Sequence, residues 1–313
     1  MNPREAPRLH PNTSAALPAD LRDRLLRLRP SYGTSATPRA ATPQPSATLP
    51  PTLAERIERM RRRAAADGRS SRDADLARMT NGRWLAPQLL VVERRLPLGH
   101  VHGRVRLELA RASVPRLLES LGARTADPDR LVFFDTETSG LAGGTGTIVF
   151  TVGLARFDRE ALRLRQLLIT SFAAEAALIE AVRAFVSAGS CLVSYNGKSF
   201  DAPLVRTRAR LLNMPDPLGE TEHVDLLHPV RRAFRRDWPD CRLRTAEEFA
   251  LGFSRIDDLP GSQVPEVFRR FMRFGDLEPL PRVLEHNRHD LVSLAALLDP
   301  LAAACRVGRH ATF

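Results

Sequence analysis

The stretch LVFFDTETSGLAGGTGT, residues 131–147, decides the fold of the chain. Four apolar residues run directly into Asp135 and Glu137, which predicts a buried strand that ends in two carboxylates. Side chains two residues apart lie on the same face of a strand, so these carboxylates lie side by side. Such a pair repels unless a cation lies between its members, and Mg²⁺ or Mn²⁺ prefers oxygen ligands. Two acids at a solvated strand end remain the alternative for this tripeptide alone.

The turn after this strand is rich in glycine but lacks the Gly-Lys-Ser/Thr ending of a phosphate-binding P-loop. The pattern therefore argues against nucleotide hydrolysis of the P-loop type. Glycines allow a backbone to approach a nucleotide closely, and Thr138 and Gly140 are candidate substrate-binding residues on that ground. A plain tight turn explains the glycines equally well.

A second pattern, CLVSYNGKSFDAPLVRTRAR at residues 191–210, reads as an apolar strand, a polar turn and a helix that begins near Asp201. Asp201 is a candidate metal ligand, although an aspartate at this place also serves as a helix cap. Asn196 adds a polar group at the same strand end. Lys198 is the one lysine of the chain. It is a candidate for contact with a phosphate, and the alternative is that it has no role.

A third pattern, PLPRVLEHNRHDLVSLAALL at residues 279–298, predicts a long amphipathic helix whose inward stripe includes Asn287. At 100° per residue, His286 and Asp290 share one edge of that stripe as an i, i+4 pair. His289 points to the other side and is expected to be solvated. On its own, the His286 and Asp290 pair is more typical of a structural hydrogen bond than of catalysis.

The periodicity around these patterns predicts an α/β fold with a mixed β-sheet flanked by helices on both faces. Strands are predicted at residues 84–108 (a hairpin or meander), 131–134, 147–157, 162–170, 191–195 and 223–227, and helices at 114–121, 175–186, 202–212 and 280–298. We divide the chain into a leader at 1–75, a small β-rich lead-in at 76–127 and the main domain at 128–305.

The leader accounts for most of the formal charge of +11. Residues 1–70 hold 13 arginines and 6 acidic residues, and residues 1–52 hold ten prolines, a composition that predicts disorder. Residues 21–28 form a basic amphipathic patch that is a candidate docking segment for a protein partner, with a transient helix of no function as the alternative. Residues 53–69 predict a charged helix, either a solvated face or a phosphate contact.

Several classes of protein are disfavoured by the composition. No apolar run is long enough to cross a bilayer and the N-terminus lacks the apolar region of a signal peptide, so we expect a cytoplasmic protein with no membrane partner. The three cysteines are scattered and show neither zinc-binding spacing nor a disulfide framework.

Together, the three patterns resemble the DEDD exonucleases of the ribonuclease-H-like superfamily, which includes polymerase proofreading domains, RNase D and RNase T. More narrowly, DTETSGLAGGTGT, YNGKSFDAPL and HNRHDLVSL resemble the predicted YprB-type exonuclease family, over about residues 99–298. The resemblance implies that two Mg²⁺ or Mn²⁺ ions are held by four carboxylates, those of Asp135, Glu137, Asp201 and Asp290. It also implies that His286 activates water.

The implied activity is 3′-to-5′ exonuclease cleavage of a single-stranded 3′ end, with release of 5′-mononucleotides from DNA or RNA. One feature departs from the family, whose catalytic histidine lies five residues before the last aspartate, whereas tyrosine members use the four-residue spacing found between His286 and Asp290. Two other functions stay open: a nucleic-acid-binding module without turnover, and a structure-selective endonuclease.

Overall fold

The structure, a computed structural model, describes residues 71–140 and 146–310, with side chains described as far as residue 305. Residues 1–70 of the predicted leader, with its basic patch at 21–28 and its predicted charged helix at 53–69, lie outside the described residues. Residues 71–80, which include the last five residues of the predicted leader, are helical. Within the described ranges, none of the helices combines the length and the apolar character needed to cross a membrane.

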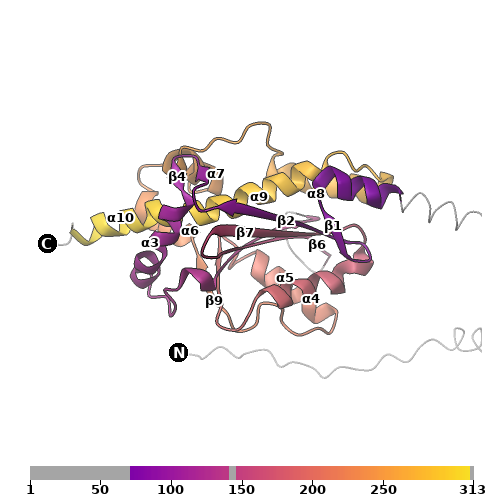
Figure 1. Ribbon diagram of the computed structural model, residues 1–313, viewed down its shortest axis with the longest axis horizontal. Coiled ribbons are helices and arrows are strands. Elements are labelled where there is room, and N and C mark those ends of the chain that lie inside the picture. The colour runs from indigo at the N-terminus through magenta and orange to yellow at the C-terminus, as the bar shows by residue number, and fades with distance from the viewer. Residues whose placement is uncertain (1–70, 141–145, 311–313) are drawn as a thin grey trace, which may run out of the picture. The chain divides into compact units, whose positions relative to one another are not determined.

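A seven-stranded mixed sheet forms the centre of the fold, in the order β1-β2-β7-β6-β5-β8-β9 (Figure 1). Its strands are β1 (Arg83–Ala86), β2 (Leu89–Pro97), β5 (Leu131–Thr138), β6 (Val149–Phe157), β7 (Ala161–Ile169), β8 (Cys191–Ser194) and β9 (Glu222–Asp225). Neighbours from β1 to β5 pair antiparallel, whereas β8 and β9 run parallel to β5. A separate two-stranded sheet pairs β3 (Val101–His102) with β4 (Val105–Arg106).

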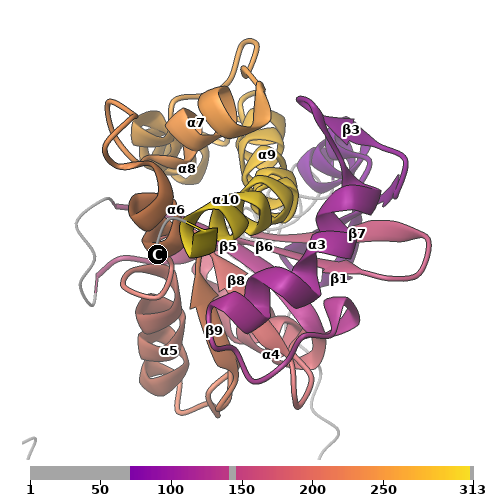
Figure 2. The same ribbon diagram turned by 90° about the vertical axis from the view of Figure 1, so that its left-hand side faces the viewer.

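Helices cover both faces of the large sheet, as the periodicity predicts. They are α3 (Leu107–Ser120), α4 (Glu175–Phe185), α5 (Asp201–Leu211), α6 (Leu227–Phe234), α7 (Leu243–Ala246), α8 (Val264–Phe274), α9 (Leu280–Ala296) and α10 (Leu298–His310). In both views α7, α8, α9 and α10 lie on one side of the sheet, and α4 and α5 lie on the other (Figures 1 and 2). The predicted α/β class with a mixed, helix-flanked sheet is confirmed.

β1 and β2 extend the large sheet through the pairing of β2 with β7. The strands predicted for residues 84–108 are therefore neighbours of strands in the main domain. The division of the chain at residues 75 and 127 stays a prediction.

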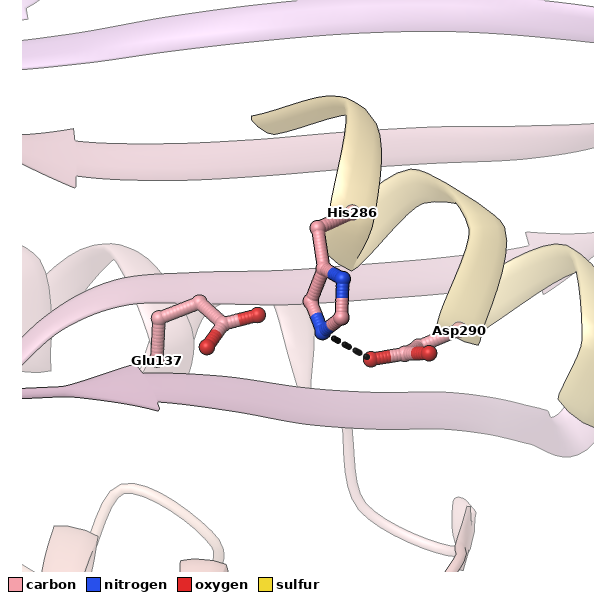
Figure 3. Close-up of side chains that lie close together, drawn as sticks. All are labelled: Glu137, His286 and Asp290. Carbon is pink, nitrogen blue, oxygen red and sulfur yellow. Dashed lines mark ion pairs between the residues drawn. The ribbon is translucent and has the colours of Figure 1, made fainter. Parts of the chain in front are cut away.

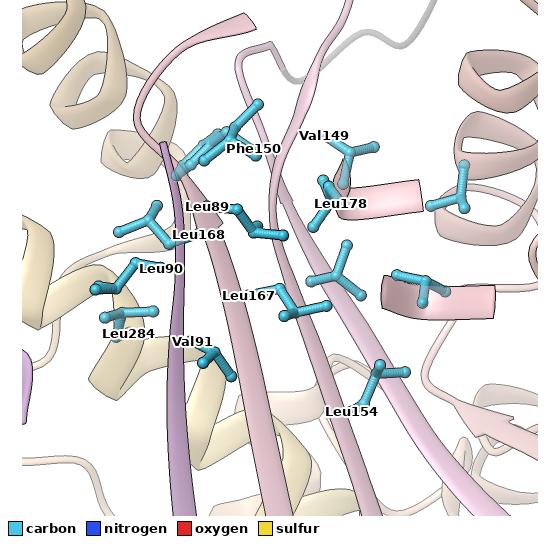
Figure 4. Close-up of a cluster of buried hydrophobic side chains, with 14 of the residues drawn as sticks. Leu89, Leu90, Val91, Val149, Phe150, Leu154, Leu167, Leu168, Leu178 and Leu284 are labelled. Carbon is cyan, nitrogen blue, oxygen red and sulfur yellow. The ribbon is translucent and has the colours of Figure 1, made fainter. Parts of the chain in front are cut away.

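Strand alternation gives β5 two different faces. Val132 and Phe134 belong to the same buried cluster as Leu178 of α4 and Val205 of α5; part of this cluster is drawn in Figure 4. Leu131 and Phe133 belong to a second cluster, which includes residues of α3 and α10. Because side chains alternate along a strand, Asp135 and Glu137 continue the face of Phe133, and Thr136 continues the face of Phe134.

The helix α9 is positioned on the sheet by one buried amide, that of Asn287. Its Oδ1 accepts a hydrogen bond from Gln166 Nε2 at 2.9 Å, and its Nδ2 donates to Asp135 Oδ2 at 2.7 Å. Gln166 and Asp135 are both register partners of Gly153, the residue of β6 between them. A Cβ atom at Gly153 would lie 2.3 Å from Asn287 Oδ1, so only glycine admits this close approach.

We therefore expect Gly153→Ala to destabilise the fold by about 1–3 kcal/mol, the usual cost of overpacking a buried site. The added methyl group must displace the Asn287 amide, which has no room to withdraw without losing its hydrogen bonds to Gln166 and Asp135. Urea unfolding followed by circular dichroism measures this loss.

The matched control is Gly99→Ala, because a Cβ atom at Gly99 meets nothing within 4 Å. This control should change the free energy of unfolding by less than about 0.5 kcal/mol, as expected of a surface substitution. Equal stability of the two variants would show that α9 does not depend on the space above Gly153.

Candidate functional site

Three side chains from β5 and α9 converge at one point. Glu137, His286 and Asp290 each offer a ligand atom, and these atoms all lie within 4.8 Å of one another. Figure 3 shows Glu137 on the strand facing the two residues of the helix. The distance from His286 Nε2 to Asp290 Oδ2 is 3.6 Å, as the i, i+4 spacing on one helix edge predicts.

The other two predicted ligands border this group. Asp135 accepts the hydrogen bond from Asn287 and is half-buried in the wall of the same cavity as His286 and Asp290. Asp201, at the first position of α5, accepts a hydrogen bond from the Thr136 hydroxyl. Thr136 lies on the face of β5 opposite to Asp135, so Asp201 approaches the site from the side of the sheet that carries α5.

The four carboxylates share one electrostatic environment. Burial raises the pKa of Asp135 well above its ordinary value, and the charges of Asp290, Glu137 and Asp201 raise it further. Burial raises the pKa of Glu137 in the same way, with contributions from Asp290 and Asp201. The pKa of Asp201 rises to about 6, mainly through burial, although the Thr136 hydroxyl opposes the rise. Such mutual repulsion favours the binding of a cation among these groups.

One protein cation is already present in the cluster, the guanidinium of Arg255. Its side chain is only 4% exposed, and it donates to Glu247 through two nitrogens, at 2.6 and 2.8 Å. The same group also donates to Asp258 and to Asp290 Oδ1. Asp290 therefore has one oxygen held by the protein, whereas its Oδ2 faces His286.

His286 is oriented by Asp258. The ring Nδ1 lies 3.0 Å from Asp258 Oδ2, which only accepts, and 3.3 Å from Arg255 Nη1, which only donates; the shorter contact is a hydrogen bond when Nδ1 carries the proton. That tautomer leaves Nε2 as the basic nitrogen, turned towards Asp290 Oδ2. Two lone pairs then face each other across 3.6 Å, a geometry that a shared proton, a water or a cation relieves.

These groups line a cavity of about 290 Å³. Its wall includes Asp135, Arg255, Asp258, His286 and Asp290. Carboxylate oxygens are the donors that Mg²⁺ and Mn²⁺ prefer, so the carboxylates present fit the predicted metals.

The predicted substrate-binding residues form hydrogen bonds with other parts of the protein. The Thr138 hydroxyl donates to the Gly140 carbonyl at 2.7 Å. The backbone amides of Asn196 and Lys198 donate to the buried Asp225 carboxylate, at 2.7 and 3.1 Å, so Asp225 shapes the loop between β8 and α5. None of these four residues, Thr138, Gly140, Asn196 and Lys198, lines the carboxylate cavity, and their roles stay predictions.

The expected solvation of His289 is wrong. Its side chain is 13% exposed, its Nε2 lies 3.2 Å from Glu285 Oε1, and its ring packs against Phe253 at 5.4 Å between centroids. The helix phase predicted from the sequence is right, but the segment that contains Phe253 covers α9 on that side as well. Periodicity along one helix carries no information about such a covering segment.

The sequence patterns did not predict three residues of the site, which are Arg255, Asp258 and Asp225. Arg255 is one arginine among many and lies outside the regular elements, as does Asp258. Asp225 ends β9 in the structure but lies in the middle of the strand predicted at residues 223–227, so the pattern of an acid at a strand end did not mark it.

Asp135→Asn should stabilise the cation-free protein, because it removes a charge from the carboxylate cluster and keeps the acceptor for Asn287. We expect a gain on the order of 1–2 kcal/mol at pH 8, corresponding to about one pKa unit of relieved repulsion. Urea unfolding in EDTA at pH 5 to 8 measures it.

The pH dependence has a defined sign. Because folding raises the pKa of Asp135 above its ordinary 3.8, the folded state holds a proton that the unfolded state has lost, and wild-type stability falls as the pH rises through this window. The gain in Asp135→Asn relative to wild type should therefore grow with pH, and Mn²⁺ should stabilise wild type more than the variant. The exposed Asp237, changed to Asn, is the control that should show neither effect.

Comparisons with known proteins agree with the motifs. Residues 132–302 match the family model of the RNase H superfamily. The uncharacterized protein YprB of Bacillus subtilis (strain 168) is 36% identical over 214 residues, which are 66% of this chain and 52% of that protein. The chain thus spans about half the length of this curated relative.

Solved structures show weaker likeness. The family B DNA polymerase of the hyperthermophilic archaeon Pyrobaculum calidifontis gives a TM-score of 0.41 at 19% identity, over 55% of this chain and 27% of that one. Exonuclease I of E. coli in complex with a dT13 oligonucleotide gives 0.36 at 17% identity, over 56% and 40%. Scores this low carry no argument about the site. The family match covers more than half of the sequence, and the chain therefore belongs to the RNase H superfamily, as its three motifs predict.

Proposed function

We propose that the chain is a metal-dependent 3′-to-5′ exonuclease that hydrolyses phosphodiester bonds of DNA or RNA and releases 5′-mononucleotides. The observation that carries the proposal is the convergence of Glu137, His286 and Asp290 within 4.8 Å, beside the cavity wall formed by Asp135. The RNase H superfamily membership supports it, because the three motifs on which the resemblance to DEDD exonucleases rests all lie within the matched residues.

The proposed ligands of two Mg²⁺ or Mn²⁺ ions are Asp135, Glu137, Asp201 and Asp290. When bound, such ions supply Lewis acidity to the scissile phosphate and stabilise charge on the attacking and leaving oxygens. The protein positions the ligands in advance: Asn287 donates to Asp135, Thr136 donates to Asp201, and Arg255 holds one oxygen of Asp290.

His286 is the proposed general base. The hydrogen bond of Nδ1 to Asp258 leaves Nε2 free to take a proton from the attacking water. The negative charge of Asp258 also stabilises the imidazolium that this transfer creates. Asp258, which lies outside α9, positions the His286 ring and its Nε2. This contact compensates for the four-residue spacing between His286 and Asp290.

The central prediction concerns the reaction itself. With Mn²⁺, the protein should shorten a 5′-labelled oligonucleotide stepwise from its 3′ end and release labelled mononucleotide at once from a 3′-labelled one. Asp201→Asn should lower the rate at least 10²-fold, as expected for loss of a group in a catalytic constellation. Electrophoresis of both labelled strands, as DNA and as RNA, follows the products.

A circular single strand is the discriminating substrate, because it offers no 3′ end. Cleavage of the circle would identify an endonuclease, and metal-independent binding without any product would identify a non-catalytic module. Either result contradicts the proposed activity.

The role of His286 is tested by three variants. His286→Ala should lower kcat by about 10² to 10⁴ fold, the range for loss of a general base. Asp258→Asn should lower kcat in the same direction but less, because the amide keeps an acceptor oxygen for Nδ1 but removes the charge that stabilises the imidazolium. Initial rates measured over a range of oligonucleotide concentrations up to saturation separate kcat from KM.

His289→Ala is the matched control on the same helix. It removes packing against Phe253 and should reduce stability while activity per folded molecule is kept. Unchanged kcat in His286→Ala would assign the proton transfer elsewhere. A large loss of Mn²⁺ affinity in that variant, measured by calorimetry, would make His286 a metal ligand instead.

A further inference from the structure

A second cavity, of about 740 Å³, adjoins the carboxylate cavity and has a different chemistry. Tyr195 and Leu243 line both cavities, so the two share a wall. The second cavity is lined by three arginines, Arg231, Arg235 and Arg242, and by the indole of Trp238. An acidic cavity and a basic cavity thus lie next to each other.

The arginines of the second cavity are available for a ligand. Arg231 and Arg235 lie one turn apart at the end of α6, and both are exposed. Within residues 71–140 and 146–305, neither guanidinium has a carboxylate oxygen within 4.0 Å. Arg242 forms an ion pair only with Asp240, at 3.7 Å. By contrast, Arg206 and Arg208 of α5 form ion pairs with Asp216 and Glu175.

Trp238 supplies an aromatic surface that is already in place. Its ring stacks on Phe234, with centroids 4.2 Å apart and planes at 7°, while Trp238 itself lines the cavity. Bases stack on such platforms without regard to sequence. The Tyr195 hydroxyl donates to the Cys241 carbonyl at 2.7 Å, which fixes the wall between the two cavities.

We propose that the second cavity binds the nucleotides of a single strand next to the scissile phosphate, with Arg231, Arg235 and Arg242 at its phosphates and Trp238 against a base. The assignment rests on the proposed function for the position of the scissile bond. Charge complementarity carries it: three arginines, Arg231, Arg235 and Arg242, line the cavity against one acid, Asp240. A polyanion that enters an acidic centre needs such a neighbouring basic surface.

The experiment measures binding without turnover. Fluorescein-labelled oligo(dT) and oligo(U) are titrated with the full chain in EDTA at several salt concentrations, and fluorescence anisotropy gives Kd. Because each phosphate contact on a single strand contributes about 0.7 to the salt dependence, Arg231→Ala with Arg235→Ala should reduce the slope of log K against log salt by about 1.4. The corresponding double lysine variant should keep the wild-type slope.

The matched control is Arg94→Ala with Arg159→Ala, two exposed arginines on β2 and in the turn between β6 and β7 that do not line the cavity. It should leave the slope unchanged. Trp238→Ala should weaken binding about tenfold or more at constant salt slope, and Trp238→Phe should restore most of the loss. Circular dichroism establishes that each variant is folded.

Equal slopes in the double alanine variant, its control and wild type would overturn the proposal, as would normal affinity in Trp238→Ala. An acidic peptide that competes with oligonucleotide only in wild type would assign the cavity to a protein partner instead. The binding experiment requires no cleavage of the oligonucleotide. A protein without nuclease activity would therefore contradict the proposed function but not the assignment of this cavity. Active protein with unaltered binding in these variants contradicts only the assignment of this cavity.

Discussion

The contact of the Asn287 amide with Asp135 is the constraint on which the candidate site depends. It joins the third motif to the first across three strands, because Gln166 holds the amide from the other side and Gly153 leaves the space between them. The helix cannot rotate without breaking both hydrogen bonds. The side chains of His286, the residue before Asn287, and of Asp290, one turn after it, are thereby fixed over the end of β5.

The site combines groups that oppose folding. Burial raises the pKa values of Asp135 and Glu137, which means that their charged forms are destabilised where they lie. Arg255 offsets part of this repulsion, with Glu247 and Asp258 as further partners. A fully compensated cluster would hold no cation, so the incomplete neutralisation is itself a functional property of the arrangement.

The sequence contains enough information for the parts of the site that lie on regular elements. Alternation on β5 places Asp135 and Glu137 on one face, and helical phase places His286 beside Asp290, because both periodicities are local. The family resemblance supplies the order of the motifs and hence the carboxylates that belong together.

Residues outside the regular elements were not predictable in this way. Arg255 and Asp258 reach the site from a segment without periodicity, and their spacing to His286 is set by how that segment folds over α9. The same segment covers His289, which explains why a right helix phase gave a wrong exposure. Trp238 was likewise not marked by any sequence pattern, although it lines the cavity next to the carboxylates.

Under the proposed function, the two adjoining cavities address a problem common to enzymes that act on polyanions. A carboxylate cluster able to hold divalent cations repels a phosphodiester when the cations are absent, so affinity for the strand must come from elsewhere on the surface. Arg231, Arg235 and Arg242 provide positive charge outside the cluster, where it does not neutralise the metal ligands. Arg255, inside the cluster, is committed to Glu247, Asp258 and Asp290 and cannot serve both purposes. Under the proposed function, strand binding falls to the arginines of the second cavity and cation binding to the carboxylates, so each can be altered without the other.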